Sequence, residues 1–323
     1  MKSSLFSSLA VLLLAVSLAG MAAPAVNPEL RVTNLVAEFL TFHEAAEGVE
    51  RDMREEAEAE GEPFDSNLFE ERLKELWHEH LGGMGTLLAR DRARLWEAQN
   101  LADAWDRYGD RLDRIRRAGD GVSPNPAGVL RQVSQLLELD RPLQVHMVLY
   151  VGTFQDDPAF RLRDGEYSVL LPVEQLPQNL RPVLMDLYTR AIHARMSGRP
   201  ADDGLSLAQH LFLRGLALRV QEEADPGRWA HEYLLRSQDW LLTAEQRDGA
   251  ILNGVRSRLN ERNPERLAAY LDGGGATGLR GEFDYAAWRV SGMLLMNGWT
   301  LDRLARVPEG EVGALVAETL RDS

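Results

Sequence analysis

Residues 205–220, LSLAQHLFLRGLALRV, are apolar on nearly every side of the helix that their spacing predicts. A helix with this pattern is buried all round. Arg214 lies in the middle of the segment, between Leu213 and Gly215. Because an unpaired buried charge costs several kcal/mol, the fold must bring a carboxylate to this guanidinium. The segment therefore sets two requirements on the fold. Other elements must surround this helix, and one of them must supply an acid to Arg214.

The helix predicted over residues 182–198 offers that acid. One side of it carries an apolar stripe at helical spacing, formed by Leu184, Leu187, Tyr188, Ala191 and Ile192. Asp186, Arg190 and His193 lie on the opposite side. A solvated face with one acid–arginine pair is the simpler interpretation of that side. The burial of Arg214 favours instead an ion pair between Asp186 and Arg214, with Arg190 as a further partner.

Two segments before these helices have the patterns of β-strands. Residues 144–152 (QVHMVLYVG) alternate and are rich in β-branched and aromatic residues. Tyr167–Val173 (YSVLLPV) is the second predicted strand, and its proline suits an edge strand or a strand end. Other segments follow helical patterns, apart from a glycine- and proline-rich linker at 119–128. We therefore predict an α+β fold that is mostly α, with a small sheet.

The two helices around residues 186 and 214 resemble the motif helices of uncharacterised zinc-peptidase-like proteins of the gluzincin type. Those proteins carry H-E-x-T-H-A-x-H on one helix and E-G-L-A on the next, with P-G downstream. The matching residues here are Thr189, Ala191, His193, Gly215, Leu216, Ala217 and Pro226–Gly227. The resemblance spans roughly residues 145–316, and it implies a zincin-like core.

The chain departs from the gluzincin pattern at the positions that carry the chemistry. Asp186 stands where the resemblance places the first zinc histidine, and Leu187 where it places the general-base glutamate. Arg190 replaces the second histidine, and Arg214 replaces the third ligand, a glutamate. Zinc hydrolysis needs three ligands and a base, and an arginine stays protonated. We therefore expect no catalytic residue, no metal and no cofactor, with Asp186, Arg190, His193 and Arg214 as candidate binding residues.

The first 25 residues have the features of a bacterial export signal. Lys2 precedes an apolar run over residues 5–18, and Ala23-Pro24-Ala25 offers a small-x-small cleavage site. The run is shorter than the roughly 20 residues of a spanning helix. We expect a periplasmic or secreted protein with no membrane span after signal removal; the alternative is an uncleaved anchor. The chain has no cysteine, so it must fold without disulfides.

These patterns divide the chain into four predicted parts. They are a signal peptide over 1–25, a helical lobe over 26–120, a linker and lead-in over 121–143, and a zincin-like pseudo-peptidase domain over 144–323. The formal net charge of -14 repels nucleic-acid phosphates, so we expect no nucleic-acid partner.

The favoured function is an exported, catalytically inactive pseudo-metallopeptidase that acts as a binding or scaffolding module. A peptide ligand could add to an edge strand at Tyr167–Val173 by β-augmentation. Two alternatives stay open. One is a structural envelope protein with a filled cleft, and the other is a hydrolase with a relocated, non-zinc mechanism that uses Asp186, His193 or Glu174.

Overall fold

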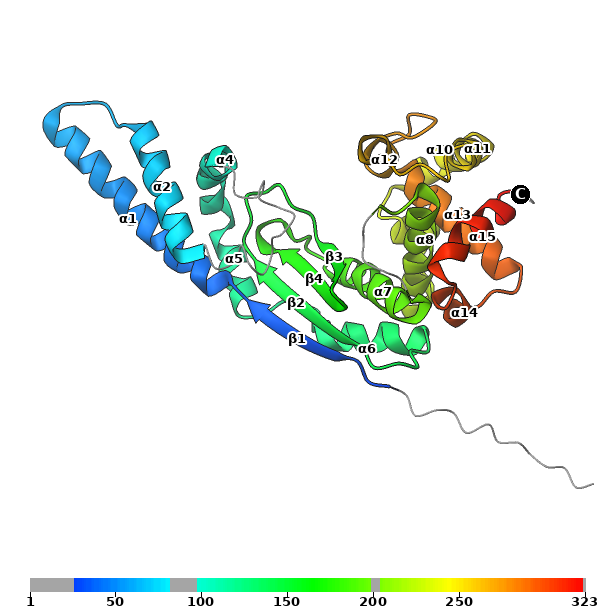
Figure 1. Ribbon diagram of the computed structural model, residues 1–323. Coiled ribbons are helices and arrows are strands. Elements are labelled where there is room, and N and C mark those ends of the chain that lie inside the picture. The colour runs from blue at the N-terminus through cyan, green and yellow to red at the C-terminus, as the bar shows by residue number, and fades with distance from the viewer. Residues whose placement is uncertain (1–25, 82–97, 199–203, 322–323) are drawn as a thin grey trace, which may run out of the picture.

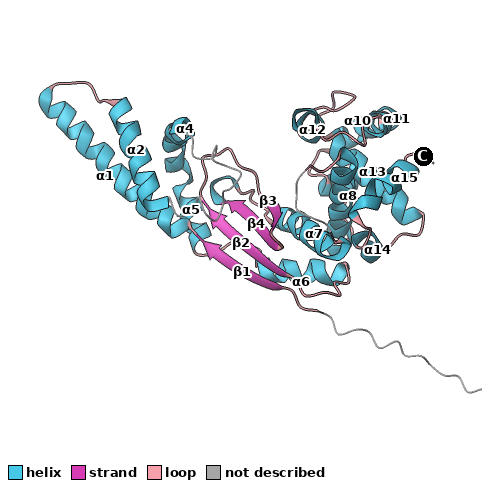
Figure 2. Cartoon of the chain, in the orientation of Figure 1, coloured by secondary structure: helices cyan, strands magenta, loops and turns pink. Residues whose placement is uncertain are grey.

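The computed structural model describes residues 26–81, 98–198 and 204–321. The predicted signal peptide lies outside these ranges, so its cleavage and the export that it implies stay predictions. Helices surround one four-stranded sheet near the middle of the chain (Figures 1 and 2). The predicted class, α+β and mostly α, is therefore confirmed, whereas the zincin-like core stays a prediction. Within the described ranges, no helix combines the length and the apolar character that crossing a bilayer requires.

The sheet has the strand order β1-β2-β4-β3. Its strands are β1 (Glu29–Asn34), β2 (Gln144–Tyr150), β3 (Ala159–Arg163) and β4 (Glu166–Pro172). β1 and β4 pair with β2 in parallel, and β3 pairs with β4 as an antiparallel hairpin. Asp164 and Gly165 form the hairpin turn with φ of 51° and 80°. Positive φ at both central residues is the geometry that Asp-Gly favours in a two-residue hairpin.

β1 and β3 correct the expectations from the sequence. β2 and β4 confirm the two predicted strands, but the segment before residue 119 also supplies a strand, in register from Glu29 opposite Gln144 to Asn34 opposite Leu149. The sheet therefore crosses the predicted boundary between the helical lobe and the following domain. The predicted linker and lead-in at 121–143 contains a helix, α6 (Pro126–Leu136), which Asn125 caps through its side chain.

The remaining N-terminal helices project from the carboxyl end of the strands (Figure 1). They are α1 (Val36–Glu60), α2 (Ser66–Leu81), α4 (Ala98–Tyr108) and α5 (Leu112–Gly119). Aromatic rings hold them together: Phe42 packs edge-on against Trp77 with centroids 4.9 Å apart, and Phe39 packs against Tyr108 at 4.8 Å. Such pairs contribute about 0.5–1.5 kcal/mol each beyond their buried area. The described residues of this segment outside β1 are thus mainly helical, and residues 82–97 lie outside the described ranges.

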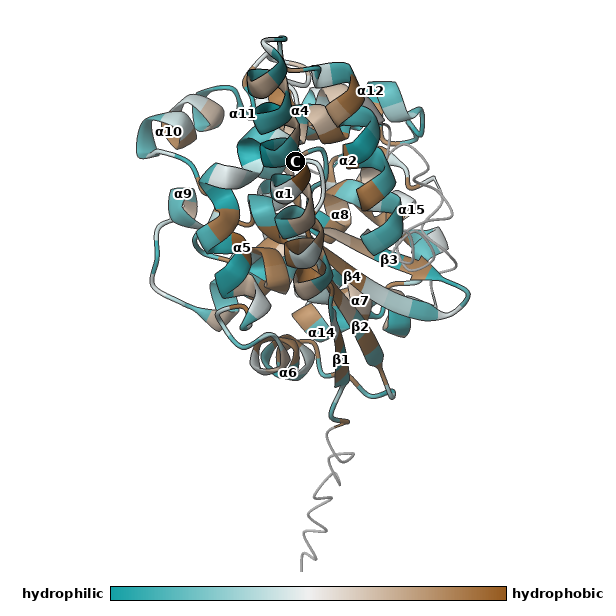
Figure 3. Cartoon of the chain, turned by 90° about the vertical axis from the view of Figure 1, so that its left-hand side faces the viewer, coloured by the Kyte–Doolittle hydropathy of each residue, from teal (hydrophilic) through white to brown (hydrophobic). Residues whose placement is uncertain are grey.

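The C-terminal helices pack around α8 (Leu207–Ala224), as its all-apolar sequence predicts. Ser206 begins α8 with a capping box to Gln209. The other helices are α7 (Arg181–Ser197), α9 (Ala230–Tyr233), α10 (Gln238–Gln246), α11 (Asp248–Arg256), α12 (Pro264–Leu271), α13 (Glu282–Met296), α14 (Leu301–Ala305) and α15 (Glu309–Thr319). α6 and α7 contact the sheet. Figure 3 shows apolar residues along β1 and β2 and hydrophilic ones on α9.

The change Gly215→Ala tests the close approach of α8 and α13. A Cβ at position 215 would lie 2.5 Å from the backbone carbonyl oxygen of Ala287 and 2.9 Å from Cβ of Ser291. We expect the free energy of unfolding to fall by about 1–3 kcal/mol, the usual cost of overpacking, as measured by urea denaturation. The control is Gly313→Ala in α15, where nothing lies within 4 Å of the new Cβ. That change should stabilise the protein by about 0.5–1 kcal/mol, and equal effects of the two changes would contradict the packing.

Candidate functional site

The predicted ion pair between the two motif helices is present. Asp186 on α7 accepts a hydrogen bond from Arg214 Nη1 on α8 at 3.2 Å. Its other oxygen accepts from Arg190 Nε, one helical turn later on α7, at 2.6 Å. Asp186 therefore joins the two arginines that replace zinc ligands in the resemblance.

Two further residues complete this cluster, and the sequence did not indicate either of them. Arg214 Nε donates to Asp284 Oδ1 at 2.7 Å, from the first turn of α13. Arg236 Nη2 donates to the other oxygen of Asp284 at 3.4 Å. We call Asp186, Arg190, Arg214, Arg236 and Asp284 the ion cluster. No local spacing links residue 214 to residue 284, so only the packing of α13 on α8 could reveal the second acid.

The charges of the ion cluster stabilise one another against partial burial. The side chains of Asp186 and Arg214 are 14% and 21% exposed. Burial alone would raise the pKa of Asp186, but the charges of Arg190 and Arg214 outweigh it and hold that pKa below its usual value. Burial alone would lower the pKa of Arg214, but Asp284 and Asp186 outweigh it and raise that pKa above its usual value. Three cations and two anions leave the cluster with one excess positive charge.

The site does not suit a zinc ion. Each oxygen of Asp186 already accepts from a guanidinium, and Leu187, which the resemblance places at the general base, is a buried aliphatic side chain. Arg190 and Arg214 put permanent positive charge where the resemblance would place the other ligands. No group of three or more metal-ligating side chains occurs among the residues that the structure describes. The arrangement offers hydrogen-bond donors and positive charge in place of Lewis acidity.

His193 and Glu174 lie apart from the ion cluster. His193 is fully buried, packs edge-on against Phe212 with ring centroids 5.5 Å apart, and has Nδ1 4.0 Å from Glu309 Oε2 on α15. Glu174 follows β4 and accepts a hydrogen bond from the backbone N–H of Gly152 at 3.0 Å. Burial raises the pKa of Glu174 to about 7 against the opposing effect of backbone hydrogen bonds. Neither residue lines a cavity beside Asp186, which removes the geometric basis for their predicted roles there.

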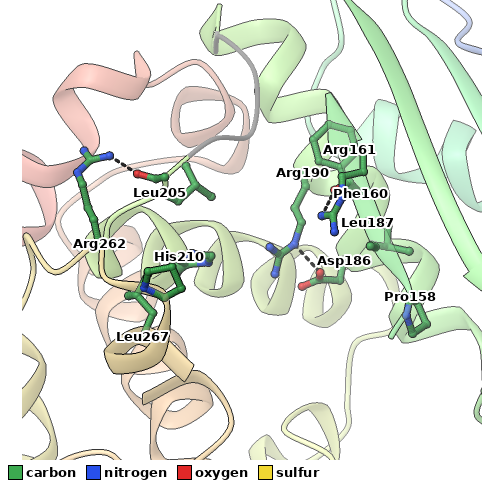
Figure 4. Close-up of a pocket in the computed structure, with 13 residues that line it drawn as sticks. Pro158, Phe160, Arg161, Asp186, Leu187, Arg190, Leu205, His210, Arg262 and Leu267 are labelled. Carbon is green, nitrogen blue, oxygen red and sulfur yellow. Dashed lines mark hydrogen bonds and ion pairs between the residues drawn. The ribbon is translucent and has the colours of Figure 1, made fainter. Parts of the chain in front are cut away.

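An open cleft runs past Asp186. Its larger part, which we call the arginine cavity, holds about 410 Å³ and is lined by Pro158, Ala159, Phe160, Arg161, Asp186, Leu187, Arg190, Gly204, Leu205, His210, Arg262, Pro264 and Leu267. Figure 4 shows Arg190 reaching Asp186 on one wall, with His210, Arg262 and Leu267 on the other. A smaller part of about 230 Å³, the leucine cavity, shares Pro158, Asp186 and Leu187 and adds Pro182, Val183, Arg214, Gln221 and Leu235.

The strand predicted to accept a peptide is not at the edge of the sheet. β4, which contains most of Tyr167–Val173, pairs with β2 on one side and β3 on the other, so it has no open edge along the paired residues. The edge that lines the arginine cavity belongs to β3. The expectation failed because the short strand β3, AFRLR, alternates over too few residues to be recognised in the sequence.

The comparisons with known proteins add no relative. A scan against protein-family models finds no match, and searches of curated proteins and of solved structures find none either. The resemblance to gluzincins therefore stays a prediction that rests on the residues of α7 and α8.

The change Arg214→Ala should lower the free energy of unfolding by about 3–5 kcal/mol, because it leaves two partly buried carboxylates without their shared cation. The control is Arg72→Ala, which removes an exposed 2.7 Å pair with Glu75 and should cost about 0–1 kcal/mol. The double change Arg214→Met with Asp186→Leu should recover part of the lost stability. It removes both members of the Asp186–Arg214 pair, and Asp284 keeps Arg236 as its partner. A loss below about 1 kcal/mol in urea denaturation of Arg214→Ala would refute the structural role of the cluster.

Glu174 should make the protein more stable in mild acid. Its pKa is about 7 in the folded chain against an ordinary value of 4.5, so between these values the folded state keeps a proton that the unfolded chain loses. The stabilisation is present below the lower value and disappears as the pH rises through the higher one, a total of roughly 3 kcal/mol.

Urea denaturation between pH 4 and 8 measures this contribution. The difference in unfolding free energy between wild type and Glu174→Gln should change by up to roughly 3 kcal/mol across that interval. The exposed Glu62 provides the control, because Glu62→Gln should follow the wild-type pH dependence. A Glu174→Gln curve parallel to wild type would contradict the raised pKa.

Proposed function

We propose that this chain is an exported binding or scaffolding module, inactive as a metallopeptidase, whose cleft takes a peptide with a free carboxylate. The observation that carries the proposal is the charge of the arginine cavity. Arg161, Arg190 and Arg262 line it, and Asp186 is the carboxylate among its lining residues. Because Asp186 already binds two guanidiniums, the cavity presents net positive charge on a chain whose formal charge is -14. An anionic group suits such a cavity.

The edge of β3 supports an extended ligand. Pro158, Ala159, Phe160 and Arg161 lie along the arginine cavity, so a peptide there meets backbone groups as well as guanidiniums. Main-chain hydrogen bonds to a sheet edge bind extended peptides with little demand on their sequence. The carbonyl of Phe160, which accepts from Arg161 Nη1 at 3.2 Å, is one of the backbone acceptors beside this cavity.

The leucine cavity supports an apolar side chain in the same ligand. Leu235 lines it and remains 65% exposed, with φ of 54°. A bulky residue in this backbone region is strained, and an exposed leucine gains from apolar contact. Val183 and Leu187 lie in the same lining. We infer that the ligand combines a carboxylate for the arginine cavity with an apolar side chain for the leucine cavity.

Export enters the proposal through the sequence. The apolar run over residues 5–18 and the Ala23-Pro24-Ala25 site support secretion to the periplasm or beyond. A structural envelope protein with a filled cleft is the first alternative, and the two open cavities weigh against it. A hydrolase that uses Asp186, His193 or Glu174 is the second, and the separation of these residues weighs against it.

The test uses the chain from Val26 and a pool of random decapeptides labelled with fluorescein at the N-terminus. Fluorescence anisotropy should show saturable binding of the free-acid pool, about tenfold tighter than that of the same pool amidated at the C-terminus, because charge-assisted hydrogen bonds to a carboxylate are lost. Arg262→Gln should weaken binding of the free-acid pool several-fold. Arg266→Gln is the matched control, because Arg266 pairs with Glu261 and lies outside the arginine cavity.

Two outcomes would overturn the proposal. Equal affinity for the free-acid and amidated pools would remove the role of the carboxylate, and the absence of saturable binding would favour the structural alternative. Elemental analysis of the same preparation supplies an independent check. One equivalent of tightly held zinc that disappears with Asp186→Ala would show that the site is metalated after all.

A further inference from the structure

Three polar side chains from neighbouring parallel strands form a continuous hydrogen-bonded chain away from the cleft. Thr33 Oγ1 on β1 lies 2.8 Å from His146 Nε2 on β2. His146 Nδ1 lies 3.2 Å from Glu166 Oε1 on β4. We call these residues the Thr33–His146–Glu166 relay. A hydroxyl on one imidazole nitrogen and a carboxylate on the other is the arrangement of an activated nucleophile, its base and the group that orients the base.

The sheet holds this geometry on one face. Arg31 is the register partner of His146 on β1, and Ser168 is its partner on β4. Thr33 and Glu166 are each two residues from these partners, so their side chains project from the same face of the sheet as His146. The next residues of β2, Val145 and Met147, point to the other side and are fully buried. The side chain of His146 is only 12% exposed and that of Glu166 is 65% exposed. The imidazole is thus shielded by its neighbours, while the carboxylate remains in contact with solvent.

The roles follow from the donors and acceptors. Glu166 accepts the Nδ1 proton of a neutral His146, which leaves Nε2 as an acceptor for the hydroxyl proton of Thr33. Glu166 also stabilises the imidazolium that forms when that proton moves. Arg31, which has no hydrogen bond or ion pair to any residue that the structure describes, supplies positive charge beside His146.

A cavity of about 420 Å³ opens beside the base of the relay. Arg31, Gln144, His146 and Glu166 line it in part, whereas Thr33 is not among its lining residues. That volume suits a small organic molecule. The uncommitted guanidinium suits an oxyanion that develops on the reacting carbonyl.

We propose that Thr33, His146 and Glu166 form a nucleophilic site for the acyl group of an activated carboxylic ester. Thr33 Oγ1 attacks the acyl carbon while its proton passes to His146 Nε2. The leaving alkoxide or phenolate departs with that proton, and the acyl group remains on Thr33 as an ester. Water then attacks the acyl group with His146 as the base, releases the carboxylic acid and restores the Thr33 hydroxyl. Glu166 acts through His146 and is a positioning residue.

This reaction goes beyond the proposed peptide binding and uses none of its residues. Loss of the carboxylate preference in the cleft would leave acylation of Thr33 unchanged, and loss of acylation would leave peptide binding unchanged. The failure of one proposal is therefore distinguishable from the failure of the other.

The experiment exposes the chain from Val26 to 4-nitrophenyl acetate and follows acetylation of each residue by peptide mass mapping. Lys74 is the lysine that remains after residue 25, so its acetylation records unspecific labelling. Acetyl should accumulate on Thr33 faster than on Lys74, and Thr33→Ser should retain the label at the same position. His146→Ala should reduce acylation of Thr33 by at least about 100-fold, the lower range of general-base catalysis, and added imidazole should restore it in part.

Matched variants separate chemistry from structure. Glu166→Gln should slow acylation of Thr33 about tenfold, and Glu166→Asp, which keeps the carboxylate, should recover part of that rate. Ser168→Ala, at the register partner of His146 on β4, and Arg266→Gln, whose side chain pairs with Glu261, should acylate as wild type. Acetylation of Thr33 no faster than that of Lys74, or a rate that His146→Ala leaves unchanged in a variant folded by circular dichroism, would overturn the proposal.

Discussion

The ion pairs of Arg214 are the interaction on which the C-terminal half of the protein depends. α8 is apolar all round and must be enclosed, yet it carries a guanidinium at its centre. Asp186 from α7 and Asp284 from α13 both bind Arg214, so the two helices that enclose α8 also neutralise its charge. The same contact brings α13 so close that position 215 has no room for a Cβ. Packing and charge therefore fix the positions of three helices relative to one another.

The arginines beside the cleft determine which chemical groups it can bind. A zinc site would polarise a carbonyl group and activate water, whereas guanidiniums bind carboxylates through directed, charge-assisted hydrogen bonds. The ion cluster keeps one excess positive charge, and Arg161 and Arg262 add to it across the arginine cavity. The cleft therefore offers donors that suit an anionic group, and the edge of β3 lies beside it.

The sheet contributes a second, separate environment. β1 joins β2 in parallel, which places Thr33, His146 and Glu166 side by side although they are far apart in the sequence. One face of the sheet is closed by α6 and α7. The other face carries the polar side chains of the Thr33–His146–Glu166 relay. Arg31, His146 and Ser168 share one register position, so Thr33, two residues after Arg31, and Glu166, two residues before Ser168, reach His146 diagonally across the strands.

The sequence by itself determined the burial of α8, the need for an acid near Arg214, the choice of Asp186 and the two strands β2 and β4. The strands and the burial of α8 follow from the periodicity of single segments. The need for an acid follows from the cost of burying the charge of Arg214 in such a segment. Tertiary structure alone decided that Asp284 and Arg236 complete the ion cluster, that β1 enters the sheet and that β3, not β4, forms the edge. The contacts of Asp284 and of β1 join segments tens of residues apart, so no spacing along the chain encodes them. β3 lies next to β4 in the chain, but its five residues alternate over too short a run to be recognised. α13 packs on α8 because it covers apolar surface and also brings Asp284 to Arg214. β1 pairs with β2 because it covers the strand and satisfies its backbone hydrogen bonds.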